Sequence, residues 1–114
     1  KYEEYLGIRP DSDRDGILQD IHWANGSFGY FPSYAIGSAV AAQIYVHLKK
    51  VMDLDALLSE GNFDPINEYL RQNVHRFGKL KNTNQVLMDL TGESFNPEYY
   101  IHYLKEKYTA LYNL

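Results

Sequence analysis

The chain has 114 residues, of which 45% are hydrophobic, so it can form one folded domain and is too short for two independent cores. Its 15 acidic residues outnumber 11 Lys and Arg for a net charge of -4, so we expect neither a nucleic-acid partner nor a membrane partner. The absence of cysteine excludes disulfides, thiolate metal ligands and a cysteine nucleophile, and is compatible with a reducing, cytoplasmic location.

The first informative stretch is residues 16–23, Gly-Ile-Leu-Gln-Asp-Ile-His-Trp. It predicts a helical turn capped by Asp13 or Asp15. Such a turn would place Gln19 and His22, three residues apart, on the same side. Asp20 and His22 are two residues apart, so they would point differently unless the turn ended between them.

A glycine-rich loop with several aromatic residues follows at residues 26–34, Gly-Ser-Phe-Gly-Tyr-Phe-Pro-Ser-Tyr. Its glycines allow a tight turn or a close approach to a ligand. The hydroxyls of Tyr30 and Tyr34 would then lie beside the imidazole of His22, which supplies hydrogen-bond donors but no nucleophile and base. The alternative is that His22 and both tyrosines are packing residues whose polar atoms are satisfied internally.

The longest predicted helix begins at Pro32 and ends at Val51. Apolar residues recur every three or four positions along one side, which we expect to face a core. They are Ile36, Val40, Ile44, Leu48 and Val51. Small residues on another side would let a neighbouring helix approach closely, namely Ala35, Ala39 and Ala42.

Shorter helices are predicted from their boundary residues. Asp64 and Asn96 each precede a proline, a pattern typical of an N-cap followed by the first helical residue, and Thr83 is a third candidate cap. Glycines at positions 61, 78 and 92 would end helices. The predicted ranges are 54–59, 65–75, 83–91 and 97–111. We therefore expect residues 1–114 to form a single all-α segment of five or six helices.

The other histidines, His47, His75 and His102, each stand alone on a helical pattern. None has a second histidine or a carboxylate at the spacing of a His-Glu-x-x-His helix. No serine lies in the strand-turn-helix context of a hydrolase nucleophile. The sequence therefore predicts no metal site within this chain.

Residues 16–23 fit the pattern Gly-x-x-Gln-Asp-x-His-Trp and resemble the signature of the carboxypeptidase Taq family, the thermostable carboxypeptidase 1 type of metallocarboxypeptidase. Residues 29–37, Gly-Tyr-Phe-Pro-Ser-Tyr-Ala-Ile-Gly, are similar to that family's Gly-Tyr-Phe-Pro-Thr-Tyr-x-x-Gly continuation. Further similarity at residues 69–78, 90–93 and 103–108 extends the resemblance over essentially the whole chain.

The resemblance implies a helical, zincin-like fold with a cleft, in which a divalent metal, usually zinc, serves the release of amino acids from peptide C-termini. The family's metal ligands lie in a His-Glu-x-x-His helix and a downstream glutamate, and this sequence contains neither. We therefore expect the chain to be the C-terminal segment of a longer protein whose ligands precede Lys1. Alone, it should be inactive.

The resemblance also implies roles for individual residues. His22 would donate a hydrogen bond to the oxyanion or to the substrate backbone, with Tyr30 and Tyr34 as alternative donors, each worth about 2.7–4 kcal/mol in the transition state. Gln19 and Asp20 would bind substrate, and Asp20 could instead orient His22 or cap a helix.

Two other functions stay open beside this peptidase reading: an autonomous helical interaction module and a degenerate, non-catalytic relative. The module would use an aromatic surface of Tyr99, Tyr100, Tyr103 and Tyr112. In the peptidase reading the partners are the peptide substrate and the rest of the parent polypeptide. The face that the parent covers would be apolar, so the isolated chain should form dimers or larger homo-oligomers.

Overall fold

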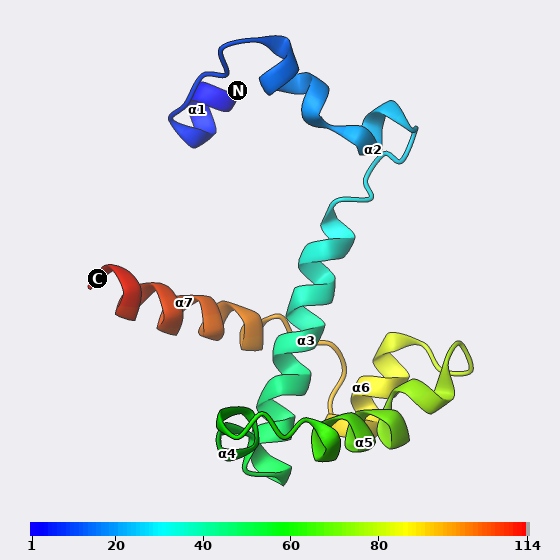
Figure 1. The fold of residues 1–114 in the computed structure, drawn as a ribbon. Helices are drawn as coiled ribbons and strands as arrows, with labels where there is room; N and C mark the ends of the chain where they lie inside the picture. Colours follow the sequence, from blue (N-terminus) through cyan, green and yellow to red (C-terminus); the bar gives the residue numbers. More distant parts are fainter. Residues whose placement is uncertain (114) are drawn as a thin grey trace. The chain divides into compact units, whose positions relative to one another are not determined.

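The computed structural model describes residues 1–113, which form seven α-helices and three short 3₁₀ helices without a β-strand (Figure 1). The all-α prediction is confirmed, but the expected five or six helices were too few, because short α-helices also form before residue 32. The chain divides into a first unit, Lys1–Ala35, and a second unit that runs from Ile36 to the end of the chain. None of the helices in residues 1–113 is long and apolar enough to cross a membrane.

The first unit contains only short elements before the start of the long helix. They are α1 (Tyr2–Leu6), 3₁₀ helices at Asp13–Asp15 and Ile17–Gln19, and α2 (Ile21–Ala24). Within residues 1–35 no apolar side chain is buried. Local hydrogen bonds and ring contacts therefore hold this unit together, and it has no hydrophobic core of its own.

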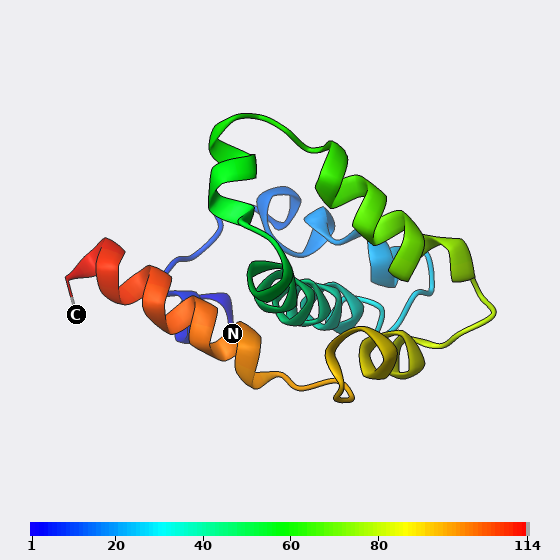
Figure 2. The ribbon, with the colours of Figure 1, turned by 90° about the horizontal axis from the view of Figure 1, so that it is seen from below.

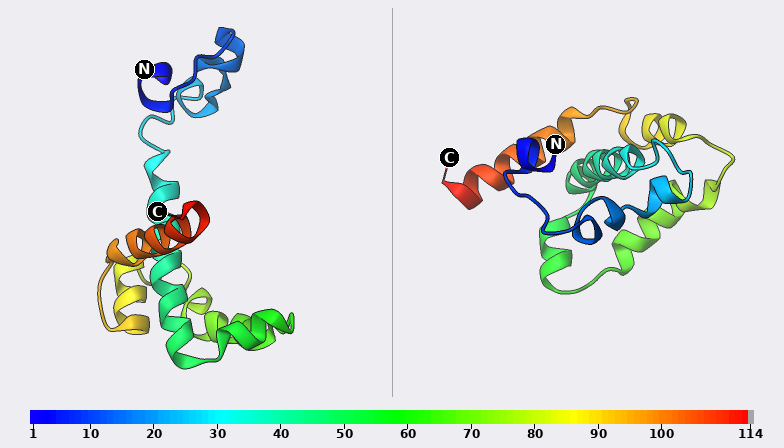
Figure 3. Two further views of the ribbon diagram at one scale, coloured as in Figure 1. Left: turned by 90° about the vertical axis from the view of Figure 1, so that its left-hand side faces the viewer. Right: turned by 90° about the horizontal axis from the view of Figure 1, so that it is seen from above.

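The second unit is organised around α3 (Pro32–Val51), which begins in the first unit. Figure 2 looks nearly along α3 and shows the remaining helices on different sides of it, and the right-hand view of Figure 3 shows the same arrangement from the opposite end. These helices are α4 (Leu54–Ser59), α5 (Asp64–Asn73), α6 (Thr83–Thr91) and α7 (Glu98–Tyr112).

The core of the second unit consists of few residues. Leu48, Leu54 and Ile66 form a buried cluster that joins α3, α4 and α5. On α6, Leu87 and Leu90 are buried as well, as is Ala39 on α3. Of the small residues expected to face a neighbouring helix, Ala39 is buried, Ala42 is half-buried and Ala35 is exposed.

The predicted apolar stripe of α3 is only partly correct. Leu48 is buried and Ile44 packs against the cluster, but Ile36 is 54% exposed and Val51 is 47% exposed. Helical periodicity specifies which residues share a side, whereas neighbouring helices decide how much of that side is covered. Here the core packs against the later turns of α3 and stops short of its last residue.

A buried polar residue, Gln43, connects α3 to the segment between α6 and α7. Gln43 is 1% exposed. Its Nε2 donates to the carbonyl oxygen of Ser94 at 3.0 Å, and its Oε1 accepts from the backbone N–H of Asn96 at 3.0 Å. A buried side chain with both ends bonded fixes one chain path, because any other path leaves polar atoms unsatisfied.

The helix ends largely follow the predicted boundaries. The ranges 54–59 and 83–91 are confirmed, and Gly92 closes α6 in the left-handed conformation with φ 84°. α5 ends earlier than predicted, at Asn73, and a 3₁₀ helix at His75–Phe77 continues to Gly78.

None of the three predicted residues occupies the N-cap position of its helix. Asn82, not Thr83, caps α6 in a reciprocal pair with Gln85. Asp64 lies in the first turn of α5, whose N-cap position makes no side-chain bond. At α7 the N-cap position is Pro97, and Asn96 lies one residue before it, where its Oδ1 accepts from the N–H of Glu98 at 3.0 Å. Neighbouring polar residues compete for a cap, and sequence alone does not rank them.

Candidate functional site

The stretch 16–23 is divided at Asp20. This residue is extended, with φ −79° and ψ 116°, so it ends the preceding 3₁₀ helix and becomes the N-cap of α2. Its Oδ1 accepts from the backbone N–H of His22 at 3.1 Å, and its Oδ2 accepts from that of Trp23 at 3.0 Å. The carboxylate thereby satisfies two donors that a helix start leaves open.

The prediction of one turn carrying both Gln19 and His22 is wrong, because the extended Asp20 places them on separate helical turns. The Nε2 of Gln19 donates to the carbonyl oxygen of Arg14 at 2.7 Å. The 3₁₀ helix at Asp13–Asp15 has no side-chain cap, and neither aspartate caps the turn that follows.

His22 lies among three aromatic rings. Its ring centroid is 4.8 Å from that of Phe31, 5.4 Å from that of Tyr30 in a stacked arrangement, and 6.0 Å from that of Tyr34, which lies edge-on. The imidazole is 19% exposed, and its buried Nδ1 makes no hydrogen bond within residues 1–113. The nearest acidic atom is Asp20 Oδ1, 3.7 Å from Nδ1.

The loop brings these rings together by turning back on α2. Gly26 and Gly29 both have left-handed conformations, with φ 74° and 73°, which suit glycine. The N–H of Ser27 donates to the carbonyl oxygen of His22 at 2.8 Å. The hydroxyl of Ser33 donates to the backbone carbonyl oxygen of Tyr30 at 2.6 Å. The loop is therefore joined both to α2 and to the first turn of α3.

The predicted site residues did not include the neighbouring aromatic residues Trp23, Phe28 and Phe31. Trp23 and Phe28 form an edge-on pair with centroids 5.0 Å apart, and both are largely exposed. Phe31 contacts His22 directly, so it belongs to the site. Its position directly after Tyr30 in an aromatic-rich loop was the available signal.

A cavity of about 350 Å³ opens beside His22 within the first unit. Its apolar wall includes Ile17, Ile21 and Phe31, and its polar wall includes Gln19 and Asp20. Three predicted site residues line this cavity, namely Gln19, Asp20 and His22. The other two, Tyr30 and Tyr34, contact His22 in the ring cluster. The first unit therefore brings all five predicted site residues together.

The residues present do not fit a divalent metal. Within residues 1–113, no three His, Asp or Glu side chains lie together in a way that could hold an ion. His47 pairs with the hydroxyl of Tyr69 at 2.8 Å, and His102 pairs with Glu106 at 3.2 Å. Burial, and then the charge of Lys50, lower the pKa of His47, so this histidine favours its neutral form.

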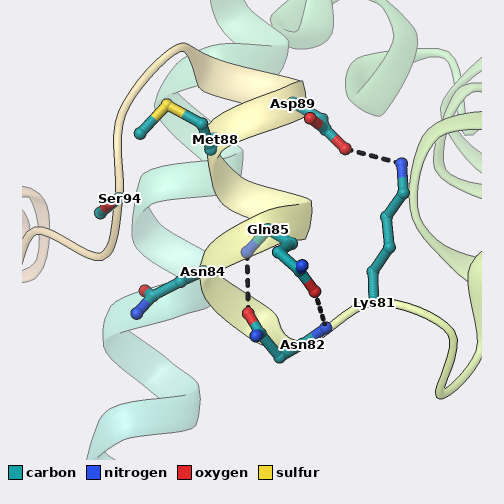
Figure 4. Close-up of a pocket in the computed structure, with 7 residues that line it drawn as sticks. All are labelled: Lys81, Asn82, Asn84, Gln85, Met88, Asp89 and Ser94. Carbon is teal, nitrogen blue, oxygen red and sulfur yellow. Dashed lines mark hydrogen bonds and ion pairs between the residues drawn. The ribbon is translucent and has the colours of Figure 1, made fainter.

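A second cavity, of about 400 Å³, lies at the start of α6 (Figure 4). Its polar side chains already have partners within the protein. Lys81 pairs with Asp89 at 2.6 Å, Asn82 and Gln85 form the reciprocal cap, and Asn84 accepts from the N–H of Phe95 at 3.2 Å. These contacts explain its residues as structural, so the ring cluster around His22 is the stronger candidate site.

Comparison with known proteins adds independent information. The profile of the family described as "Carboxypeptidase Taq (M32) metallopeptidase" matches residues 1–108. The chain is 50% identical to Carboxypeptidase 1 of Bacillus subtilis over 100% of this chain's length. It is 46% identical to Thermostable carboxypeptidase 1 of Pyrococcus furiosus over 93% of this chain's length.

The solved structures agree with the sequence matches. The M32 carboxypeptidase from Deinococcus radiodurans R1 superposes with a TM-score of 0.87 at 36% identity, covering 99% of this chain and 23% of that structure. The chain likewise spans 23% of the Bacillus subtilis protein and 21% of the Pyrococcus furiosus protein. It therefore corresponds to less than a quarter of the length of the relatives it matches.

Proposed function

Because the chain belongs to the carboxypeptidase Taq (M32) metallopeptidase family, we propose that it is the C-terminal portion of a zinc-dependent carboxypeptidase that releases amino acids from the C-termini of peptides. The names of the Bacillus subtilis and Pyrococcus furiosus relatives support a carboxypeptidase. Residues 1–114 act in this proposal as one helical portion of the longer enzyme.

The proposed enzyme needs a divalent metal, and such a metal supplies an activated water for attack on the peptide carbonyl. Following the family resemblance, we assign the ligands to a His-Glu-x-x-His helix and a downstream glutamate in polypeptide outside this chain. On this proposal the 114-residue chain alone neither holds the catalytic metal nor hydrolyses peptides.

The contribution of the chain is a set of hydrogen-bond donors for the substrate. The observation that carries this role is the half-buried imidazole of His22 against Tyr30, Phe31 and Tyr34. A donor held by rings and a capped helix is preorganised, and such donors stabilise the negative charge that develops on the carbonyl oxygen. We assign this task first to His22, with the phenols of Tyr30 and Tyr34 as the alternative catalytic donors.

The cavity beside His22 would receive the peptide. Gln19 lies on its wall and uses its Nε2 in the bond to Arg14, so we assign the amide oxygen of Gln19 to substrate N–H groups. Asp20 lies on the same wall and belongs to the proposed substrate-binding side of the site.

An interaction surface is the second candidate function. On α7, Tyr103 and Tyr112 are exposed, although Tyr99 and Tyr100 are half-buried and the Tyr99 hydroxyl donates to Glu93. In our proposal this surface contacts the rest of the parent polypeptide or a second copy, and contact with a second copy would make the enzyme a homo-oligomer.

The absence of cysteine is compatible with the cytoplasmic location that we propose.

The test is His22→Ala in the full-length enzyme. We expect kcat to fall about 10²- to 10³-fold, as on loss of an oxyanion donor, with metal content unchanged by elemental analysis. His75→Ala is the matched control, because His75 is exposed and outside the ring cluster, and its kcat should stay at the wild-type value. Loss of metal with an unchanged rate per bound metal would contradict the donor role.

A further inference from the structure

The carboxylate of Asp20 faces back into its own chain. Both of its oxygens accept backbone N–H groups at the start of α2, from His22 at 3.1 Å and from Trp23 at 3.0 Å. The side chain is 30% exposed. Both carboxylate oxygens therefore bond to the start of α2, although Asp20 also lies on the wall of the cavity.

The imidazole of His22 turns its Nδ1 toward the same carboxylate. Nδ1 is buried, has no hydrogen bond within residues 1–113 and lies 3.7 Å from Asp20 Oδ1. A lone pair on Nδ1 would face this negative charge, so the carboxylate favours a proton there. An approach of about 0.8 Å would bring the pair to hydrogen-bond distance.

Three aromatic side chains also lie against the ring. Tyr30, Phe31 and Tyr34 contact the imidazole, and their ionisable groups are the two phenols. Among the contacts that residues 1–113 make with this ring, Asp20 is the one carboxylate. Asp20 is therefore the group that selects which ring nitrogen carries the proton.

We propose that Asp20 is a positioning residue that caps α2 and holds the Nδ1 proton of His22, so that Nε2 is the atom presented to the substrate. A hydrogen bond from Nδ1–H to this carboxylate would fix the orientation of the ring and leave Nε2 as the nitrogen for the substrate, which donates there when it also carries a proton. One carboxylate thereby fixes both the backbone and the ring of the same histidine. This inference rests on the proposed function, and it gives Asp20 an effect through His22 in place of direct substrate binding.

The experiment uses Asp20→Asn and Asp20→Ser in the full-length enzyme. Both replacements retain a good N-cap acceptor and remove the charge. The matched control is Asp53→Asn, because the Oδ1 of Asp53 caps α4 through the N–H of Ala56 at 3.1 Å. Among the described residues Asp53 makes no ion pair with a histidine.

We expect both Asp20 variants to lower kcat about 10- to 100-fold, the range found when a partner that orients a functional histidine is lost. KM for a peptide substrate should change much less than kcat. In ring-¹⁵N-histidine NMR spectra, with the His22 signals assigned from His22→Gln, the fraction of His22 carrying a proton on Nδ1 should fall. Asp53→Asn should leave kcat and the His22 signals at their wild-type values.

Two results would overturn the inference. A raised KM at unchanged kcat would make Asp20 a substrate-binding residue. An unchanged kcat and unchanged His22 signals would leave Asp20 as a helix cap alone. The proposed function fails separately, if His22→Ala retains full kcat. In that case the Nδ1 signal still decides whether Asp20 holds the proton.

Discussion

The two units of the chain are stabilised in different ways. In the first, apolar side chains such as Leu18 are exposed, and the ring cluster at His22 is held by a cap, loop hydrogen bonds and ring contacts. In the second, residues such as Leu54 and Leu87 are fully or nearly fully buried. The candidate site thus lies in the unit without a hydrophobic core, which supports the proposal that further polypeptide covers it.

The largest effect is expected when a leucine is replaced by alanine in each unit, which tests the difference in burial between them. Leu87 is 0% exposed and Leu18 is 70% exposed. Leu87→Ala should lower the free energy of unfolding of the chain by about 2–5 kcal/mol, because it leaves a cavity in a packed core. Leu18→Ala should change it by about 0.5 kcal/mol or less. Urea denaturation followed by circular dichroism measures both, and equal losses would refute the contrast between the units.

A smaller effect is expected from the polar connection inside the second unit. Gln43→Leu keeps the side-chain volume but leaves the carbonyl of Ser94 and the N–H of Asn96 without their partner. We expect a loss of about 1–3 kcal/mol in the free energy of unfolding. Gln72→Leu is the control, because Gln72 is exposed and, within residues 1–113, its side chain bonds to Glu68 of its own helix. If both variants had wild-type stability, Gln43 would not fix the segment between α6 and α7.

The smallest effect distinguishes the cap observed at α6 from the one predicted. Asn82→Ala should cost about 1 kcal/mol, since its Oδ1 accepts from the N–H of Gln85 at 2.9 Å. Thr83→Ala should leave the free energy of unfolding near the wild-type value, because Thr83 is the first residue of α6 and follows the cap. Thermal unfolding of the two variants gives the comparison, and a reversed order would restore Thr83 as the cap.

Several features were predictable because they depend on residues close together in the chain. The ends of α4 and α6 follow from short-range signals, and residues 16–23 with their continuation predicted the family that the profile match then confirmed. The five site residues were also named from this stretch. Their roles in the reaction remain proposals.

Other features depend on residues far apart in the sequence. Nothing in the local pattern marks Gln43 as buried, since its partners lie about 50 positions away. The sequence left open whether Asp20 binds substrate, orients His22 or caps a helix. The folded backbone at Asp20 is extended, and its side chain caps α2.

The amino-acid sequence by itself indicated the helices from α3 onward, several of their ends and the family, because glycines, prolines and apolar periodicity act within a few residues. The tertiary structure decided which parts of α3 are covered, how Gln43 is satisfied and which rings surround His22. These outcomes depend on burial and on contacts between segments, and both exist only once the chain has folded.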